Sequence, residues 1–317
     1  GSHSIQRPDG KFLVILGGGS AVTNIYDPIA NTMTAGSNLT AAAGPGSHSI
    51  QRPDGKFLVI LGNSTSNTSI YDPLNNVFTA GPALSTITNA GDSIQRPDGK
   101  FLVVIASSGV TNIYDPISNT MIAGPSLTAA GGTGSHSIQR PDGKFLVILG
   151  SAVTNIYDPL ANTITEGPSL TTSINTHSHS IQRPDGKFLV VIGADPGITN
   201  IYDPISNTIT AGPSGLADAR NGPHSKQRPH GKFMVVPGAR TAATHLYDPI
   251  SNTITAGPNL TGNARNGSHA TQLPNGTYLI IHGDASGSGG VSTSIYDPAW
   301  VVSGSYESEA MNLPKLN

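Results

Sequence analysis

The chain has 317 residues, with 38 glycines, 24 prolines, no cysteine and a formal net charge of −2. Charged residues make up only 11% of it, against roughly 25% in an average soluble domain. This composition gives no electrostatic case for nucleic acid or an anionic membrane as partner, and the lack of cysteine excludes disulfides, thiolate metal sites and cysteine nucleophiles.

The sequence shows no targeting segment and no membrane segment. No apolar run approaches the roughly 20 residues of a membrane-spanning helix, and no signal-peptide pattern opens the chain. A chain without cysteine is compatible with the cytosol and with export, so the sequence identifies no compartment.

One phrase recurs seven times and organises the whole chain. Its first copy reads SHSIQRPDGKFLVILG over residues 2–17 and is followed by Tyr26-Asp27-Pro28. The proline of the phrase returns every 43 to 45 residues. Such a period is the signature of a repeat architecture, so we expect one closed array rather than two average domains.

The first half of each unit predicts a β-hairpin. In the first unit the first strand is His3–Gln6 and the turn is Arg7–Lys11. Pro8 presets the first corner of this turn, and Gly10 takes its left-handed position. The second strand is the unbroken apolar run Phe12–Leu16. A strand that is apolar on both faces is covered on both faces, so we expect each sheet to pack between two others.

The second half of each unit predicts two more strands. Thr23–Tyr26 is the third strand of the first unit, and Asp27-Pro28 begins the next turn, because the aspartate can accept a backbone N–H. Asn31–Ala35 is the fourth strand. No window of the chain keeps a 3.6-residue period, so we expect almost no helix.

Seven units of four antiparallel strands predict an all-β fold, a seven-bladed β-propeller that forms a single domain over residues 1–317. We expect ring closure by side-by-side packing of the first and last units, with the C-terminal tail as a clasp. The expected blades are about 1–45, 46–89, 90–133, 134–176, 177–221, 222–266 and 267–317.

The order of residues within a unit resembles the kelch repeat and the wider galactose oxidase-like propellers. The resemblance rests on His-Ser, a glycine turn, an apolar strand that ends in glycine, and Tyr-Asp-Pro, and it covers essentially the whole chain. Two features depart from kelch repeats: the aromatic residue seven positions after the tyrosine is mostly Met or Ile, and the double glycine is complete only at Gly17-Gly18.

Most charges of the chain belong to the two turns of each unit. Propeller connectivity places both turns on one rim, so we expect a solvated ring of weak ion pairs there. The alternative is a repetitive docking surface for a periodic ligand.

The loops of the opposite rim carry few charges except in the last three units. We interpret this sector as a candidate binding site in which arginines bind a carboxylate or a sugar ring. The alternative is that each arginine holds its own loop. The candidate residues are Arg220, Arg240, Arg265, His245 and Asp284.

A histidine stands five residues before the turn proline in six units, and an aspartate takes its place in the third. The repeat should arrange these residues around one mouth of the central channel. Such a ring could hold a metal ion or, when protonated, an anion. The alternative is that each side chain only fixes its neighbouring loop. The ring residues are His3, His48, Asp92, His136, His179, His224 and His269.

No known catalytic motif is visible in the chain. The copper radical oxidases among the propellers that it resembles use a tyrosine cross-linked to cysteine, which a chain without cysteine cannot make. There is no Gly-x-Ser-x-Gly, no P-loop and no His-Glu-x-x-His. We therefore expect no enzyme activity and no cofactor.

The sequence-based interpretation is a noncatalytic, kelch-like scaffold that binds protein partners, and we expect a monomer. Two alternatives stay open. One is a carbohydrate-binding propeller with several weak, repeated sites. The other is a recently amplified or engineered propeller without a dedicated activity, since the first five units are close copies.

Overall fold

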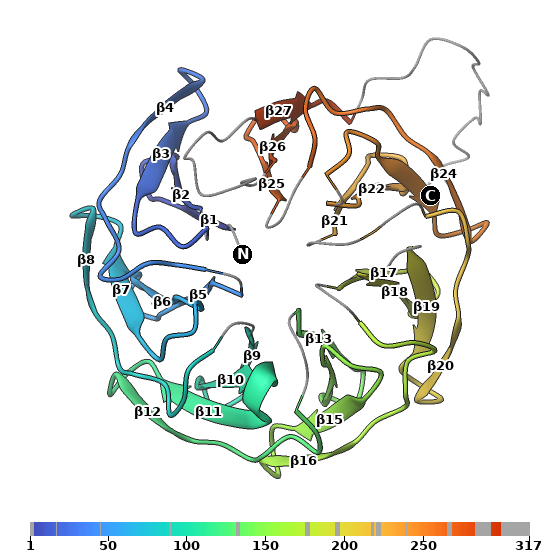
Figure 1. Cartoon of the computed structure of the whole chain (residues 1–317), viewed down its shortest axis with the longest axis horizontal. Helices are drawn as coiled ribbons and strands as arrows, with labels where there is room; N and C mark the ends of the chain where they lie inside the picture. Colours follow the sequence, from blue (N-terminus) through green and yellow to red (C-terminus); the bar gives the residue numbers. More distant parts are fainter. Residues whose placement is uncertain are drawn as a thin grey trace, which may run out of the picture.

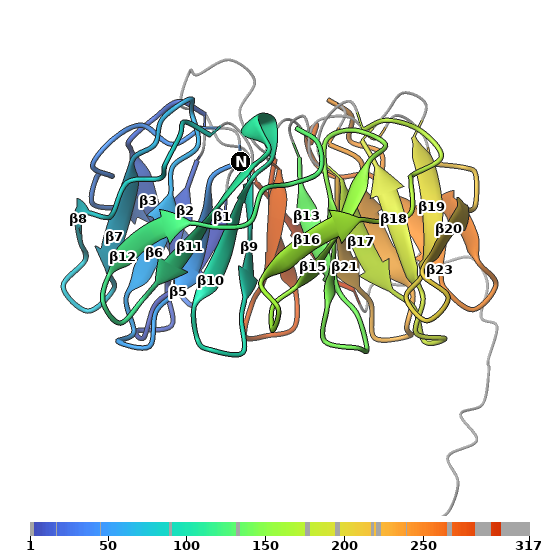
Figure 2. The ribbon, with the colours of Figure 1, turned by 90° about the horizontal axis from the view of Figure 1, so that it is seen from below.

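The computed structural model describes residues 3–16, 18–44, 46–88, 91–130, 134–174, 178–193, 197–216, 219, 223–238, 240–264, 268–282 and 293–298. Seven small sheets stand around a central opening (Figure 1), and all seven lie in one layer when seen from the side (Figure 2). The predicted seven-bladed, all-β propeller is confirmed.

The strands follow each other in chain order, four to a blade in blades 1 to 6. Blade 1 contains β1 (His3–Gln6), β2 (Phe12–Ile15), β3 (Thr23–Asp27) and β4 (Thr32–Ala35); blade 2 contains β5 (His48–Gln51), β6 (Phe57–Ile60), β7 (Thr68–Asp72) and β8 (Val77–Ala80); blade 3 contains β9 (Gly91–Gln95), β10 (Phe101–Ile105), β11 (Val110–Asp115) and β12 (Thr120–Ala123). Blade 4 contains β13 (His136–Gln139), β14 (Phe145–Ile148), β15 (Thr154–Asp158) and β16 (Thr163–Glu166); blade 5 contains β17 (His179–Gln182), β18 (Phe188–Ile192), β19 (Ile198–Asp203) and β20 (Thr208–Ala211). Blade 6 contains β21 (His224–Gln227), β22 (Phe233–Val236), β23 (His245–Asp248) and β24 (Thr253–Ala256), and the described strands of blade 7 are β25 (His269–Gln272), β26 (Tyr278–Ile281) and β27 (Thr293–Tyr296).

Each blade is an antiparallel meander whose first strand is innermost (Figure 1). Within the described residues the only helical segment is the 3₁₀ turn η1 (Ala106–Ser108), as the sequence predicts. No helix in this part of the chain has the length and hydropathy needed to cross a membrane.

The turns form as their residues predict. In blade 1 the Arg7 N–H donates to the Lys11 carbonyl, and Gly10 has a φ of 78°. In the second turn the Asp27 carboxylate accepts the backbone N–H of Ile29, and the chain then passes through a left-handed asparagine. Lys11 Nζ lies 3.0 Å from Asp27 Oδ2, so both turns of the blade share one rim, which we call the turn face.

The second strand of each blade is buried on both sides. In β2, Leu13 and Ile15 belong to a cluster with residues of blade 2 such as Val59. Phe12 and Val14 of the same strand belong to a cluster with residues of blade 7. Alternate side chains of one strand therefore pack into the two seams that flank its blade. Full burial of each is worth about 1.5–3 kcal/mol, so these strands hold the ring together.

Arginine side chains cross the seams on the turn face. Arg7 Nη1 donates to the Tyr71 hydroxyl (2.6 Å) and to Asn76 Oδ1 (2.9 Å) of blade 2, while its other nitrogens bind Asp9. The side chain of Arg7 is only 11% exposed. The expectation of a solvated ring of ion pairs is therefore wrong for the arginines, because their side chains connect neighbouring blades. The expectation does describe the lysine–aspartate pairs, which are more exposed. The matching contacts are Arg52–Tyr114, Arg96–Tyr157, Arg140–Tyr202, Arg183–Asn252 and Arg228 with the Pro298 carbonyl.

The seam between blades 7 and 1 closes the ring differently. Leu273 occupies the position of the seam arginine and packs with Phe12, Tyr26 and Leu279. The described strands of blades 1 and 7 form separate sheets, so this seam is closed by side-by-side packing, as predicted. The predicted clasp lies beyond Pro298, outside the described residues.

The seam arginines should stabilise the ring more than the turn lysines. We expect Arg96→Met to lower the free energy of unfolding by about 1.5–3 kcal/mol, because it removes a charged donor from the Tyr157 hydroxyl of the next blade. Lys100→Met, which removes the exposed pair with Asp115, should cost less than about 1 kcal/mol. Urea denaturation measures both; equal losses would contradict the role given to the arginine.

Candidate functional site at the channel mouth

The predicted ring of histidines lies at the end of the central channel opposite the turn face. Each ring histidine opens an innermost strand, at the upper side of Figure 2, where the chain begins. The ring residues in strand order are His3 (β1), His48 (β5), Asp92 (β9), His136 (β13), His179 (β17), His224 (β21) and His269 (β25).

Side chains alternate between the two faces of each innermost strand, and this alternation points the imidazole rings toward the seams between blades. Ile5, two residues after His3, packs against blade 2, and residues two apart in a strand share a face. The contacts of blade 4 agree with this, because His136 Nδ1 lies 2.9 Å from Ser178 Oγ of blade 5. Ser178 Oγ also donates to the Gly134 carbonyl (3.1 Å). The single proton of this serine is therefore committed to a carbonyl, and His136 donates to the serine through Nδ1.

The seam between blades 2 and 3 departs from this arrangement. Blade 3 has Gly91 where blade 5 has Ser178. A Cβ at Gly91 would lie 3.1 Å from His48 Cε1 and 3.0 Å from the Val104 carbonyl oxygen. The missing side chain therefore gives the His48 ring room against β9.

His48 consequently binds a different serine. Its Nδ1 lies 3.0 Å from the Gly46 carbonyl oxygen, which can only accept, so Nδ1 carries the proton. Its Nε2 lies 2.7 Å from Ser93 Oγ and, in the neutral ring, accepts the hydroxyl proton. A serine hydroxyl, an imidazole base and a carbonyl that orients the base thus follow one another across the seam. We call Ser93 and His48 the seam dyad.

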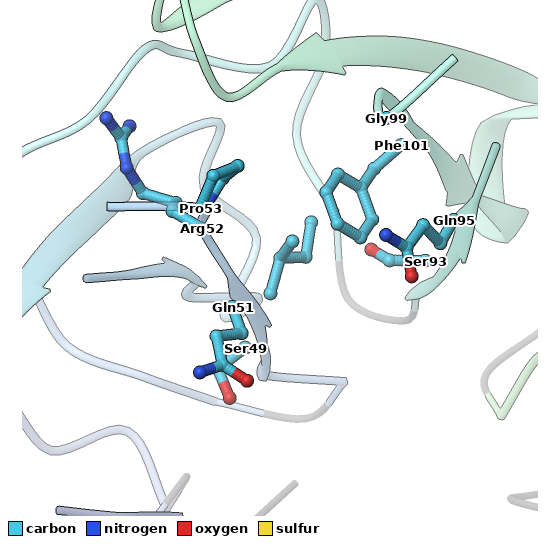
Figure 3. Close-up of a pocket in the computed structure, with 9 residues that line it drawn as sticks. Ser49, Gln51, Arg52, Pro53, Ser93, Gln95, Gly99 and Phe101 are labelled. Carbon is cyan, nitrogen blue, oxygen red and sulfur yellow. The ribbon is translucent and has the colours of Figure 1, made fainter. Parts of the chain in front are cut away.

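Ser93 also lines a cavity of about 460 Å³ in the channel wall. Figure 3 shows Ser93, Gln95 and Phe101 of blade 3 on one side of it, and Gln51 and Arg52 of blade 2 on the other. The serine of the dyad is therefore accessible from a pocket with an aromatic ring and two primary amides.

Asp92 lies beside the dyad on the same strand. Burial raises the pKa of Asp92, while hydrogen bonds from Ser137 of blade 4 and the charge of His48 oppose this rise. Burial also lowers the pKa of His48, against the Gly46 hydrogen bond and the charge of Asp92. Both pKa shifts favour the uncharged forms of Asp92 and His48. The His48 imidazole is therefore neutral at neutral pH, and its Nε2 can accept a hydrogen bond.

The next two histidines are also neutral. Burial lowers the pKa of His136 to about 4. Burial, together with the charge of His136, lowers the pKa of His179 to about 3. His136 Nε2 and both ring nitrogens of His179 are buried and have no hydrogen-bond partner among the described residues.

Two of the other predicted site residues, Arg240 and His245, lie in the described part of the chain. Arg240 is exposed, with a φ of 60°, and its N–H donates to the Ala264 carbonyl. His245 is 8% exposed in β23, where it pairs with Val235. The structure thus places His245 inside the blade rather than on the loop surface. Arg220, Arg265 and Asp284 lie outside the described residues, so binding by this sector stays a prediction.

The comparisons with known proteins give a structural match only. No family model matches the chain, and no curated protein matches it. Among solved structures, a fungal alcohol oxidase of the AA5 family, in complex with copper, matches with a TM-score of 0.74 and 18% identity, over 93% of this chain and 73% of that chain. At this identity the likeness shows the fold, and it supports the galactose oxidase-like part of the resemblance; the kelch repeat is not confirmed.

This match contradicts the functional interpretation drawn from the sequence. The expected noncatalytic scaffold and the expectation that the chain is not an enzyme were based on missing motifs, whereas a solved structure that shares the propeller is an enzyme. The two alternatives to the scaffold are corrected with it. A motif made of residues close together in the sequence cannot reveal side chains from two different blades that meet across a seam.

The described residues do not fit the copper of that oxidase. No group of three or more His, Asp or Glu side chains among them could hold a metal ion. The chain also has no cysteine for a cross-linked tyrosine.

Sequence reasoning noted Asp92 as the odd member of the ring but missed Ser93. The signal was present in Gly91, which replaces the serine that precedes the ring histidine in blades 1, 2, 4, 5 and 7. The effect of Gly91 depends on the neighbouring blade, because the space beside this glycine is occupied by the ring of His48, 43 residues earlier in the sequence.

The buried histidines should make stability depend on pH. Below pH 6.5 the unfolded chain binds protons at His136 and His179 that the folded chain does not bind until about pH 4 and 3, so stability should fall as the pH falls through this window. Thermal unfolding midpoints between pH 7 and 4.5 measure the slope.

His179→Gln should flatten this slope. His230→Gln, on an exposed turn, is the matched control and should leave it unchanged. The raised pKa of Asp92 acts in the opposite direction, since it favours the folded state at low pH. Identical slopes in the wild type and His179→Gln would show that this imidazole is not held neutral.

Proposed function

We propose that the chain is a serine-dependent acyl hydrolase whose reaction centre is the seam dyad of Ser93 and His48. The observation that carries this proposal is the 2.7 Å contact between Ser93 Oγ and a neutral His48 Nε2 whose opposite nitrogen is fixed by the Gly46 carbonyl. A nucleophile, its base and a group that orients the base are the arrangement from which serine acyl transfer is built.

The dyad supports a two-step hydrolysis of an ester. Ser93 Oγ attacks the acyl carbon while its proton passes to His48 Nε2, and the protonated imidazole returns that proton to the departing alcohol oxygen. Water then attacks the acyl-serine; His48 Nε2 takes a proton from it and gives one back to Ser93 Oγ. The hydrogen bond from His48 Nδ1 to the Gly46 carbonyl favours the charged imidazole that forms between these steps.

The pocket favours a small, uncharged acyl compound. Its one cationic group, Arg52, is already bonded to Asp54 and to the Tyr114 hydroxyl, so it is not available to a substrate carboxylate. Phe101 offers an apolar surface, and Gln95 offers amide N–H donors beside Ser93 for a developing oxyanion. Short-chain esters fit this chemistry.

The described residues of the seam between blades 4 and 5 lack this combination. In the seam between blades 4 and 5 the serine proton goes to Gly134, so the hydroxyl is not activated. The proposed activity therefore belongs to one seam of a nearly symmetric ring. Kelch membership and a monomeric state stay predictions, supported by the residue order of the repeat and by the closure of the ring within one chain.

The proposal predicts ester hydrolysis that depends on Ser93. Purified protein should hydrolyse p-nitrophenyl acetate or butyrate and should be labelled at Ser93 by a fluorophosphonate, with the site read by peptide mass spectrometry. Ser93→Ala should lower the rate at least about 100-fold. Ser180→Ala, at the same strand position of blade 5, should leave it unchanged.

Gly91→Ser tests the geometry without touching the dyad. Its side chain would occupy the space of the His48 ring and supply the serine seen in the other seam, so the rate should fall about as far as in His48→Gln. Hydrolysis that persists in Ser93→Ala, or a fluorophosphonate that labels no serine, would reject the acyl hydrolase.

A further inference from the structure

A lysine interrupts the inner wall of the ring at the seam between blades 6 and 7. Blades 1 to 5 have a buried isoleucine as the third residue before the turn proline, such as Ile5 and Ile181, whereas blade 6 has Lys226. This residue is the third of β21, so it lies in the innermost strand. A charged side chain thus takes the place of an apolar one in an otherwise uniform wall.

The surroundings of Lys226 are apolar. The cluster that fills this seam includes Met234 and Val236 of blade 6 and Ala270 and Ile280 of blade 7. Lys226 Nζ lies over the Tyr278 ring, 6.0 Å from its centroid. Since a cation gains little from an aromatic ring at the limit of this contact, the ring alone does not hold the charge in place.

No carboxylate among the described residues compensates the amine. Each of the six turn lysines, Lys56 among them, forms an ion pair with an aspartate of its own blade, but no described carboxylate pairs with Lys226. Burial lowers the pKa of Lys226 below its ordinary value. A larger share of this amine is therefore uncharged at neutral pH than for a lysine side chain in water, and an uncharged amine is a nucleophile.

The position also gives access and a second titratable group. β21 is the innermost strand of its blade (Figure 1), and Lys226 is only partly buried, so solvent reaches part of its side chain. His224, two residues earlier, shares the face of β21, since its Nδ1 lies 3.5 Å from Ser268 Oγ of blade 7. The imidazole is therefore a second titratable group on the face of the strand that carries the amine.

We propose that Lys226 is a carbonyl-capturing site whose amine condenses with small, uncharged aldehydes that enter the channel. The amine nitrogen bonds to the aldehyde carbon, and the carbonyl oxygen leaves as water with the two amine protons, which gives a neutral imine. The apolar seam favours the uncharged imine over a protonated one, and it offers no cation for an aldehyde that carries a carboxylate. The site is independent of Ser93.

Reductive trapping tests this site. The full chain is incubated with propanal at neutral pH and quenched at intervals with sodium borohydride, which reduces a neutral imine, and peptide mass spectrometry follows the propyl group on each lysine. We expect Lys226 to be modified at least tenfold faster than Lys56 and Lys100, which are ion-paired on the turn face. A rate at Lys226 equal to or below that of these two lysines would overturn the proposal.

Two variants distinguish aldehyde capture by Lys226 from an effect on folding or on the proposed hydrolase. Lys226→Ile restores the residue of blades 1 to 5, so it should keep the thermal unfolding midpoint while the fast-modified peptide disappears. Ser93→Ala should leave trapping unchanged, which distinguishes a failure here from a failure of the proposed hydrolase. Fast modification of another lysine in Lys226→Ile, at the rate seen in the wild type, would also count against Lys226.

Discussion

Burial of the second strand of each blade on both of its faces is the constraint on which the rest of the structure depends. In β2, Leu13 and Ile15 pack toward one neighbouring blade while Phe12 and Val14 pack toward the other. A single blade cannot cover both faces of its own second strand, so this strand is stable only when other blades pack on either side of it. The innermost strands, which carry the chemistry, are positioned by this packing rather than by contacts of their own.

On the turn face, hydrogen bonds between neighbouring blades supplement the apolar packing. A seam arginine such as Arg7 binds a tyrosine hydroxyl and an asparagine of the next blade, and the left-handed asparagine is itself placed by the turn that precedes β8. The closing seam lacks this contact and uses Leu273 instead. The turn face therefore has different chemistry at the seam where the first and last blades meet.

Both proposed sites come from single departures within a repeated frame. Removing one side chain at Gly91 lets His48 accept a hydrogen bond from Ser93, whereas at Ser178 the hydroxyl gives its proton to a carbonyl. Replacing one isoleucine by Lys226 puts an amine into an apolar wall. Because the second strands hold both seams, each change acts through the side chain that it adds or removes.

The sequence by itself determined the number of blades, the strand order and the turns, because each depends on residues within one 43- to 45-residue unit. It did not determine what crosses the seams: the arginines were expected in solvent, and the chain was expected to lack catalysis. Ser93 and His48 are 45 residues apart, and their bond requires the space at Gly91 and the Gly46 carbonyl as well. Only the tertiary structure decides this, because a hydrogen bond between blades depends on which side chains are absent from a seam as much as on which are present.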